Sequence, residues 1–169
     1  KVLRKGDGMF LDACRAVATE FPEVALDTVI VDAMAALLIR DPGRFDVVVT
    51  TNMFGDILSD QAAELSGSLG LGGSINAGDA HCMAQAAHGS APDIAGQDRA
   101  NPSSLVLSAA MLLAWQAERT GQNAYAAAAA AIEQAIGAAL TAGQATRDLG
   151  GTLGTAAFGQ AIVSGIGAG

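Results

Sequence analysis

With 169 residues, of which 51% are hydrophobic, the chain has the composition of a globular domain or of part of a larger fold. Its formal net charge of -8 argues against a nucleic-acid partner, because phosphate backbones are bound by clustered lysines and arginines. No apolar run is long enough to span a bilayer, and Cys14 and Cys82 lack the spacing of a metal knuckle or a redox pair. We therefore expect a cytoplasmic protein with a small-molecule ligand and no membrane partner.

The apolar pattern predicts alternating helices and strands in the first part of the chain. Residues 8–21 carry apolar side chains at helical spacing, and residues 32–40 predict a second helix. On either side of that second helix, the β-branched residues 24–31 and the apolar run 45–50 predict strands covered on both faces. A third helix follows, and this alternation indicates an α/β layer architecture.

The middle of the chain is rich in glycine. We interpret the Gly-rich residues 70–78 as a flexible crossover between two lobes. Two helices are expected after it, over residues 104–120 and 124–141, each followed by a glycine that ends it. The second contains an alanine tract, which favours a packed helix over disorder, and a last short helix is expected near residue 156.

Asp56 and Asp60 are the first candidates for a functional site. They are four residues apart after a predicted strand, so a helix places both carboxylates on one face near its N-terminal end. Acidic side chains in a first helical turn are favoured by the helix dipole and need no ligand. Alternatively, the pair could hold a hard divalent cation such as Mg²⁺, which prefers oxygen ligands. Spacing alone leaves both interpretations open.

The run of residues 52–60, continuing to Gly70, resembles the signature of the isocitrate and isopropylmalate dehydrogenase family. The resemblance implies a partial α/β fold of that family, with Asp56 and Asp60 helping to hold Mg²⁺ or Mn²⁺. A third metal ligand, Asp32, stands in a segment that the family donates from the partner subunit. The resemblance therefore implies a homodimer with a shared active site.

A second motif covers residues 88–96 and Asn101. Taken alone it is a turn-rich loop before a helix, and it lacks the spacing of a dinucleotide fingerprint, so the fold is not expected to be a Rossmann fold. The loop resembles the adenosine-binding loop of the same family. The cofactor-binding residues that this resemblance implies are His88, Gly89, Ala91, Asp93, Ile94 and Asn101.

The residue pair Asp93-Ile94 bears on the choice between NAD and NADP. By the resemblance, Asp93 accepts hydrogen bonds from the adenosine ribose, and NADP users of the family tend to carry Lys and Tyr at this pair. A carboxylate there would repel a 2′-phosphate. The cofactor is therefore expected to be NAD.

The resemblance implies an oxidoreductase that carries out metal-dependent oxidative decarboxylation of a 2-hydroxy acid. Residues 7–10 look most like the isocitrate branch. Isopropylmalate, tartrate, malate and homoisocitrate remain open as substrates, and so does a folded fragment that only binds nucleotide or a partner. Gln85, where the family usually has Glu, leaves a further alternative, a non-catalytic regulatory subunit of a heteromeric isocitrate dehydrogenase.

The catalytic residues are not assigned from this sequence. Lys1 aligns with an asparagine of the family rather than with its catalytic lysine, and the substrate-binding arginines and catalytic tyrosine belong to a segment that would precede Lys1. We expect the chain to come from a longer gene product and to be inactive alone. Residues 1–67 are expected in the smaller, dimer-forming domain and residues 68–169 in the larger cofactor-binding domain.

Overall fold

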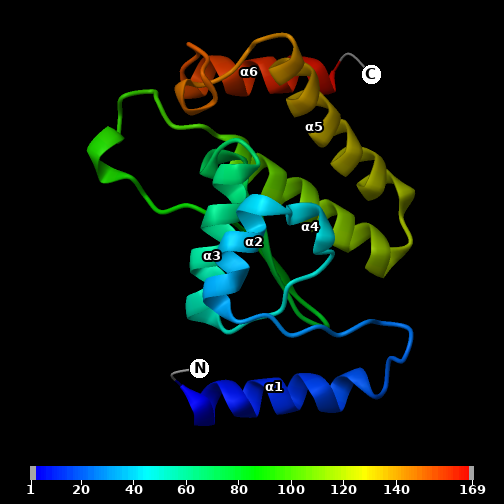
Figure 1. Ribbon diagram of the computed structural model, residues 1–169. Coiled ribbons are helices and arrows are strands. Elements are labelled where there is room, and N and C mark those ends of the chain that lie inside the picture. Colours follow the sequence, from blue (N-terminus) through cyan, green and yellow to red (C-terminus); the bar gives the residue numbers. More distant parts are fainter. Residues whose placement is uncertain (1–2, 168–169) are drawn as a thin grey trace. The chain divides into compact units, whose positions relative to one another are not determined.

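A computed structural model describes residues 3–167, and the chain divides between Ala62 and Ala63 into two compact units (Figure 1). The first unit holds α1 (Arg4–Ala18), α2 (Val31–Arg40), the 3-10 helix η1 (Pro42–Arg44) and most of α3 (Asn52–Leu65). The second holds η2 (Leu69–Leu71), β1 (Gly73–Ala77), β2 (Cys82–Ala86), η3 (Pro92–Ile94), α4 (Ser103–Thr120), α5 (Asn123–Thr141), η4 (Arg147–Leu149) and α6 (Thr155–Ile166). The fold is a helix-rich α/β structure.

In the first unit, α2 packs against α3. Met34 and Leu38 lie one turn apart on α2 and are buried with Leu58 of α3. The side-chain amide of Gln61 donates a hydrogen bond to the backbone oxygen of Ala35 at 2.6 Å, which ties the two helices together. The expected helix over residues 32–40 is confirmed, with one more residue at its start.

The strands expected at residues 24–31 and 45–50 do not form in the part of the chain described, so that prediction is wrong. Both segments contain extended backbone, but an extended segment becomes a strand only where another strand takes up its N–H and C=O groups. The described residues offer neither segment such a partner. Apolar side chains that a sheet would have buried are exposed instead, with Val24 62% and Val47 84% exposed.

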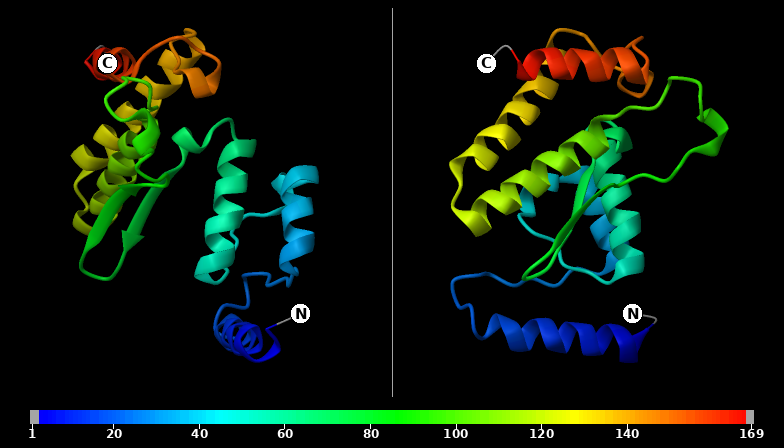
Figure 2. Two further views of the ribbon diagram at one scale, coloured as in Figure 1. Left: turned by 90° about the vertical axis from the view of Figure 1, so that its left-hand side faces the viewer. Right: turned by 180° about the vertical axis from the view of Figure 1, so that it is seen from behind.

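In the second unit, β1 and β2 form an antiparallel hairpin that packs against α4 (Figure 2). Ser104 and Ser108 lie one turn apart on α4, and both are fully buried. Ser104 donates to the oxygen of Gly72 and accepts from the N–H of Ala87, while Ser108 accepts from the N–H of Ser74 at 2.9 Å. Because these bonds use backbone groups within β1 or directly next to the two strands, α4 holds the hairpin by polar contacts as well as by packing.

The Gly-rich stretch is not a flexible crossover, because it forms η2 and β1 and packs closely against its neighbours. A Cβ atom on Gly70 would lie 2.8 Å from Asn101 Cβ and 2.8 Å from Asp148 Oδ2. A Cβ atom on Gly73 would lie 3.0 Å from the sulfur of Met111. These glycines are needed for close approach to the rest of the unit.

The helices α4, α5 and α6 supply the apolar core of the second unit. Phe158 and Ile162 of α6 are buried against one face of α5, formed by Ala135, Ile136 and Ala139. The expected helices over residues 104–120 and 124–141 are confirmed, and the alanine tract lies within a packed helix. As expected, α4 ends at a glycine, Gly121, in the left-handed conformation with φ 67°.

The helix expected over residues 8–21 is also present, but it begins earlier and ends earlier, at Arg4 and Ala18. None of its side chains is buried. The last short helix expected near residue 156 is α6. No helix described within residues 3–167 combines the length and apolar character that crossing a bilayer requires.

Candidate functional site

Asp56 and Asp60 lie one turn apart on the exposed side of α3. The helix begins at Asn52, earlier than the sequence pattern predicts, and its first turn contains no acidic residue. The helix dipole acts on charges within the first turn. It therefore does not account for this pair of aspartates, and their expected role as cation ligands stays a prediction.

No lysine or arginine among residues 3–167 forms an ion pair with either aspartate. The side-chain amide of Asn52 donates to Asp56 Oδ2 at 3.1 Å. Like charges four residues apart destabilise a helix by repulsion. Two carboxylates on one exposed face have the ligand chemistry of a hard divalent cation, which would remove that repulsion.

Asp32 lies in the first turn of α2, where its Oδ1 accepts a hydrogen bond from the N–H of Ala33 at 2.8 Å. Within the residues that the structure describes, no three His, Cys, Asp or Glu side chains come close enough together to hold a metal ion. Asp32 therefore does not join Asp56 and Asp60 within one chain. Its expected role as a ligand donated by a partner subunit stays a prediction.

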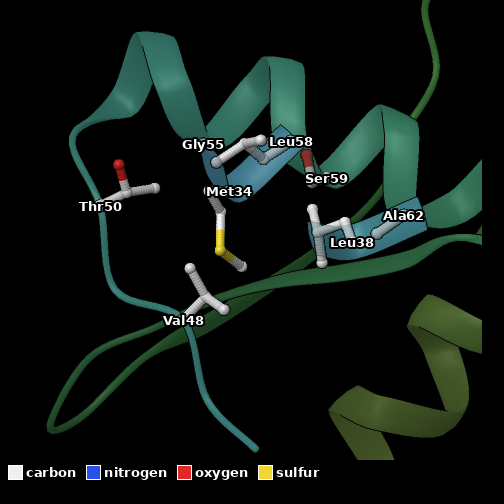
Figure 3. Close-up of a pocket in the computed structure, with 8 residues that line it drawn as sticks. All are labelled: Met34, Leu38, Val48, Thr50, Gly55, Leu58, Ser59 and Ala62. Carbon is white, nitrogen blue, oxygen red and sulfur yellow. The ribbon is translucent and has the colours of Figure 1, made fainter. Parts of the chain in front are cut away.

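An apolar hollow of about 230 Å³ lies between α2 and α3 (Figure 3). Its lining consists of Met34, Leu38, Val48, Thr50, Gly55, Leu58, Ser59 and Ala62. The carboxylates of Asp56 and Asp60 do not line it. The hollow suits apolar groups and offers no charged side chain to a hydroxy acid, so we do not assign it to the reaction.

The loop that resembles the family's adenosine-binding loop joins β2 to α4, and we call residues 88–101 the cofactor loop. It projects from the second unit as a long connection (Figure 1). Before its start, Ala87 is bonded to Ser104, and at its end the buried Asn101 accepts a hydrogen bond from the N–H of Ser103 at 2.9 Å. The loop is therefore anchored to α4 at both ends.

The middle of the cofactor loop is shaped by left-handed backbone. Ala91 has φ 42°, Gly96 has φ 74° and Asp98 has φ 51°. Gln97 donates a hydrogen bond to the backbone oxygen of Asp93 at 2.8 Å, which closes the turn between them. In the part of the chain described, the Asp93 carboxylate has no partner, so it is free to accept hydrogen bonds from a ligand.

The other expected cofactor residues lie on the same loop. His88 is half-buried, and its Nδ1 lies 2.9 Å from the backbone oxygen of Gly89. A Cβ atom on Gly89 would meet nothing within 4 Å, so this backbone is open to an approaching ligand. Ile94 is half-buried in η3. The loop thus brings the expected adenosine-site residues together in one segment, and their roles stay predictions.

Asp98 ties the cofactor loop to α6. Its Oδ1 accepts a hydrogen bond from the N–H of Ala156 at 2.8 Å, and its backbone oxygen accepts one from the N–H of Thr155 at 3.3 Å. This carboxylate caps the N-terminus of α6. A Cβ atom on Gly154 would lie 2.1 Å from Asp98 Oδ2, so the glycine is needed for the contact.

Asp148, in η4, holds the end of the cofactor loop. Its Oδ2 accepts hydrogen bonds from Ser68 Oγ at 2.6 Å and from Asn101 Nδ2 at 2.9 Å, while Oδ1 accepts one from Thr146 Oγ1 at 2.6 Å. Partial burial by itself raises the pKa of Asp148. The hydrogen bonds from Ser68, Thr146, Asn101 and its own backbone outweigh that effect and hold the pKa below its usual range.

Sequence reasoning did not assign roles to Asp98 and Asp148. A weak signal for Asp148 is its place in residues 146–151, which resemble an NAD-type pattern of the isocitrate and isopropylmalate dehydrogenase family. Nothing in the local sequence predicts that Asp98 caps a helix 58 positions away.

Comparison with known proteins identifies the family of the chain. The chain matches the family model described as isocitrate/isopropylmalate dehydrogenase over residues 1–162. It is 47% identical over 165 residues to an isocitrate/homoisocitrate dehydrogenase of Thermus thermophilus, covering 98% of this chain and 47% of the relative. It is 42% identical over 163 residues to a 3-isopropylmalate dehydrogenase of Archaeoglobus fulgidus, covering 96% of this chain and 48% of the relative.

Solved structures show the same relationship. The crystal structure of isocitrate dehydrogenase from Methylococcus capsulatus superposes with a TM-score of 0.87 at 40% identity, covering 98% of this chain and 48% of that one. A β-decarboxylating dehydrogenase from Thermococcus kodakarensis superposes with a TM-score of 0.79 at 36% identity, covering 96% of this chain and 46% of that one. The chain thus spans about half the length of the relatives it matches, and the expected partial fold is confirmed. It belongs to the isocitrate/isopropylmalate dehydrogenase family of oxidoreductases.

Proposed function

We propose that this chain supplies the metal-binding and adenosine-binding parts of an NAD-dependent dehydrogenase that oxidises and decarboxylates a 2-hydroxy acid of the isocitrate type. The observation that carries the proposal is the pair Asp56 and Asp60, exposed beyond the first turn of α3 without a cationic partner among residues 3–167. Family membership supports the reaction class, and the Thermus thermophilus relative is named an isocitrate/homoisocitrate dehydrogenase.

Asp56 and Asp60 would hold Mg²⁺ or Mn²⁺, because carboxylate oxygens are the ligands these ions prefer. Such an ion polarises a substrate hydroxyl and stabilises negative charge that develops during oxidation and decarboxylation. The chain's own contribution is to present two carboxylates from one helix, so that their backbone positions are already fixed when the ion binds.

The cofactor loop would bind the adenosine part of NAD. His88 and Asn101 would lie along the adenine, while Gly89 and Ala91 would approach with their backbone. The Asp93 carboxylate is exposed and has no protein partner within residues 3–167, so it can accept hydrogen bonds from both ribose hydroxyls. The same charge would repel the 2′-phosphate of NADP, which supports NAD as the cofactor.

We propose further that the active site is completed in a homodimer, with the partner subunit contributing Asp32. In support, no three potential ligands gather within the described part of one chain. The exposed side of α3 also carries Met53 and Ile57, which are 57% and 58% exposed, and a second subunit could cover them. This assigns dimerisation to residues 1–67 and cofactor binding to residues 68–169, as the sequence predicts.

Two observations favour other members of the family. The Archaeoglobus fulgidus relative is named a 3-isopropylmalate dehydrogenase, so isopropylmalate is the second candidate substrate. Gln85, whose side chain is exposed, stands in β2 where the family usually has Glu. This replacement favours a regulatory subunit. Asp32, Asp56 and Asp60 argue against that alternative, because a subunit without catalysis has no need of them.

The experiment measures reduction of NAD and of NADP by the natural full-length polypeptide with Mg²⁺ or with a chelator. The substrates offered are isocitrate, homoisocitrate, 3-isopropylmalate, tartrate and malate. We expect Mg²⁺-dependent formation of NADH with isocitrate and weaker reaction with NADP. NADH formation that survives the chelator would contradict the metal assignment, and no reaction with any substrate would favour the regulatory subunit.

A further inference from the structure

Both ends of the Asn101 side-chain amide are engaged by the protein. Its oxygen accepts the hydrogen bond from the N–H of Ser103 at 2.9 Å, and its nitrogen donates to Asp148 Oδ2 at 2.9 Å. Since the oxygen and nitrogen lie on opposite sides of the amide, these two bonds together fix its rotamer. Any contact of Asn101 with an adenine would then use its backbone or the remaining amide hydrogen.

The carboxylate of Asp148 serves donors that have little access to water. Ser68 is 5% exposed, Asn101 8% and Thr146 0%, whereas Asp148 itself lies at the surface. An amide at position 148 would keep the shape of the side chain but lose its charge, so the bonds from the same three donors would become weaker. The close approach of Gly70 to Asp148 Oδ2 leaves the carboxylate little room to shift.

The three bonds differ in what they connect. The bond from Asn101 reaches the last residue of the cofactor loop, whereas the bonds from Ser68 and Thr146 end on segments outside it. Ser68 also accepts a hydrogen bond from the N–H of Gly70 at 3.0 Å, which places its hydroxyl for the carboxylate. Asp148 therefore has two anchors outside the loop, and Thr146 keeps it in place to hold Asn101 even when the Ser68 bond is lost.

We propose that Asp148 is a positioning residue for cofactor binding. By holding the Asn101 amide, it keeps the cofactor loop in the conformation that receives the adenosine, and it does not touch the dinucleotide itself. This inference rests on the proposed function only for the identity of the ligand. The control of loop conformation rests on the hydrogen bonds of Asp148.

The first experiment measures hydrogen exchange of the cofactor-loop amides without nucleotide in three variants. D148N and N101A both remove or weaken the link between residues 148 and 101, whereas S68A removes a shorter bond, 2.6 Å against 2.9 Å, from the same carboxylate without altering a loop residue. We expect loop amides to exchange about tenfold faster in D148N and N101A, and within about twofold of wild type in S68A. N101A keeps the Ser68 and Thr146 bonds, so it decides the question if D148N does not fold.

The second experiment measures NAD kinetics on the natural full-length polypeptide. In D148N we expect KM for NAD to rise about tenfold while kcat stays within about twofold of wild type, because a group that only pre-shapes the loop affects cofactor binding. The S68A variant should keep the wild-type KM. A structural defect of the whole unit would instead lower the amount of active enzyme in both variants.

Several results would overturn the proposal. Equal loop exchange in D148N and S68A would show that the bond to Asn101 has no special role. A raised KM for NAD in D148N with unchanged loop exchange would show that Asp148 contacts the dinucleotide directly. If the wild-type protein binds no NAD, the proposed function fails, whereas faster loop exchange in D148N and N101A than in S68A would still support the control of loop conformation by Asp148. If the wild type binds NAD and the variants bind it equally well, only this proposal fails.

Discussion

The aspartates of α3 and the aspartate of η4 have opposite surroundings. Asp148 receives hydrogen bonds from three side chains of its own chain, and its pKa lies below the usual range. Asp56 receives one bond, from the Asn52 amide, and among residues 3–167 Asp60 has no ion-pair partner. A carboxylate whose hydrogen bonds the chain supplies itself holds the structure, whereas a pair without a cationic partner among residues 3–167 is available to an external cation.

The largest expected effect is the loss of activity when one aspartate of the α3 pair is replaced. Asp60→Asn should lower kcat/KM of the natural full-length polypeptide roughly a thousandfold with the best substrate of the panel, since a bound cation supplies several kcal/mol of charge stabilisation. Stability should rise slightly or stay constant, because the variant removes repulsion with Asp56. Kinetics with Mg²⁺ and thermal unfolding are the measurements.

Asp12→Asn is the matched control for this variant, because Asp12 is an exposed acid on α1 that pairs only with Arg15. It should leave kcat/KM unchanged. If Asp60→Asn kept wild-type activity, the pair would have no role in cation binding, and the contrast with Asp148 would lose its functional meaning.

A substitution in the apolar core between α5 and α6 should lower the free energy of unfolding more than any other substitution that we propose. Phe158 is 0% exposed at the centre of the α5–α6 core, so Phe158→Ala should destabilise the second unit by about 3–5 kcal/mol. Denaturant unfolding followed by hydrogen exchange measures the loss, which should appear in α4, α5 and α6. Val163→Ala is the control on the exposed side of α6, with Val163 61% exposed, and should cost far less. Equal losses in the two variants would contradict this assignment of the core.

Like Asp148, Asp98 has a carboxylate that accepts a hydrogen bond from its own chain. Asp98→Ala removes the cap from α6, and we expect it to lower the free energy of unfolding by about 1 kcal/mol. Loop amides around residue 98 should exchange faster. Asp93→Ala is the comparison in the same loop, and because the Asp93 carboxylate has no partner in the described chain, stability should not change. A loss as large as that of Asp98→Ala would show a contact of Asp93 within the protein.

The smallest effect is expected in the extended segment before α3. Val47 is 84% exposed, so Val47→Thr should change the free energy of unfolding of this chain by less than about 0.5 kcal/mol. Leu58→Ala in the same unit should cost about 2 kcal/mol or more, because Leu58 is buried. If Val47→Thr were as destabilising as Leu58→Ala, residues 45–50 would be packed in a sheet in this chain.

The helices are the part of the fold that the local sequence pattern predicts well. Apolar spacing and the glycines that follow predict α2, α4, α5 and α6 to within a few residues, because a helix satisfies its backbone within its own segment. The same reasoning fails for residues 24–31 and 45–50. A strand depends on a partner strand, and a strongly β-branched sequence cannot supply one by itself.

By itself, the sequence determined the family, the helices and the carboxylates that we propose as metal ligands, since each of these depends on residue identity and on spacing within one segment. Only the tertiary structure decided that the acids of α3 lie beyond its first turn and that Asp98 and Asp148 hold the cofactor loop. The partners of Asp148 lie 80, 47 and 2 positions away, so folding brings together two of the three from distant segments. That convergence separates Asp148, whose carboxylate oxygens are occupied by the protein, from Asp60, which has no ion-pair partner among residues 3–167.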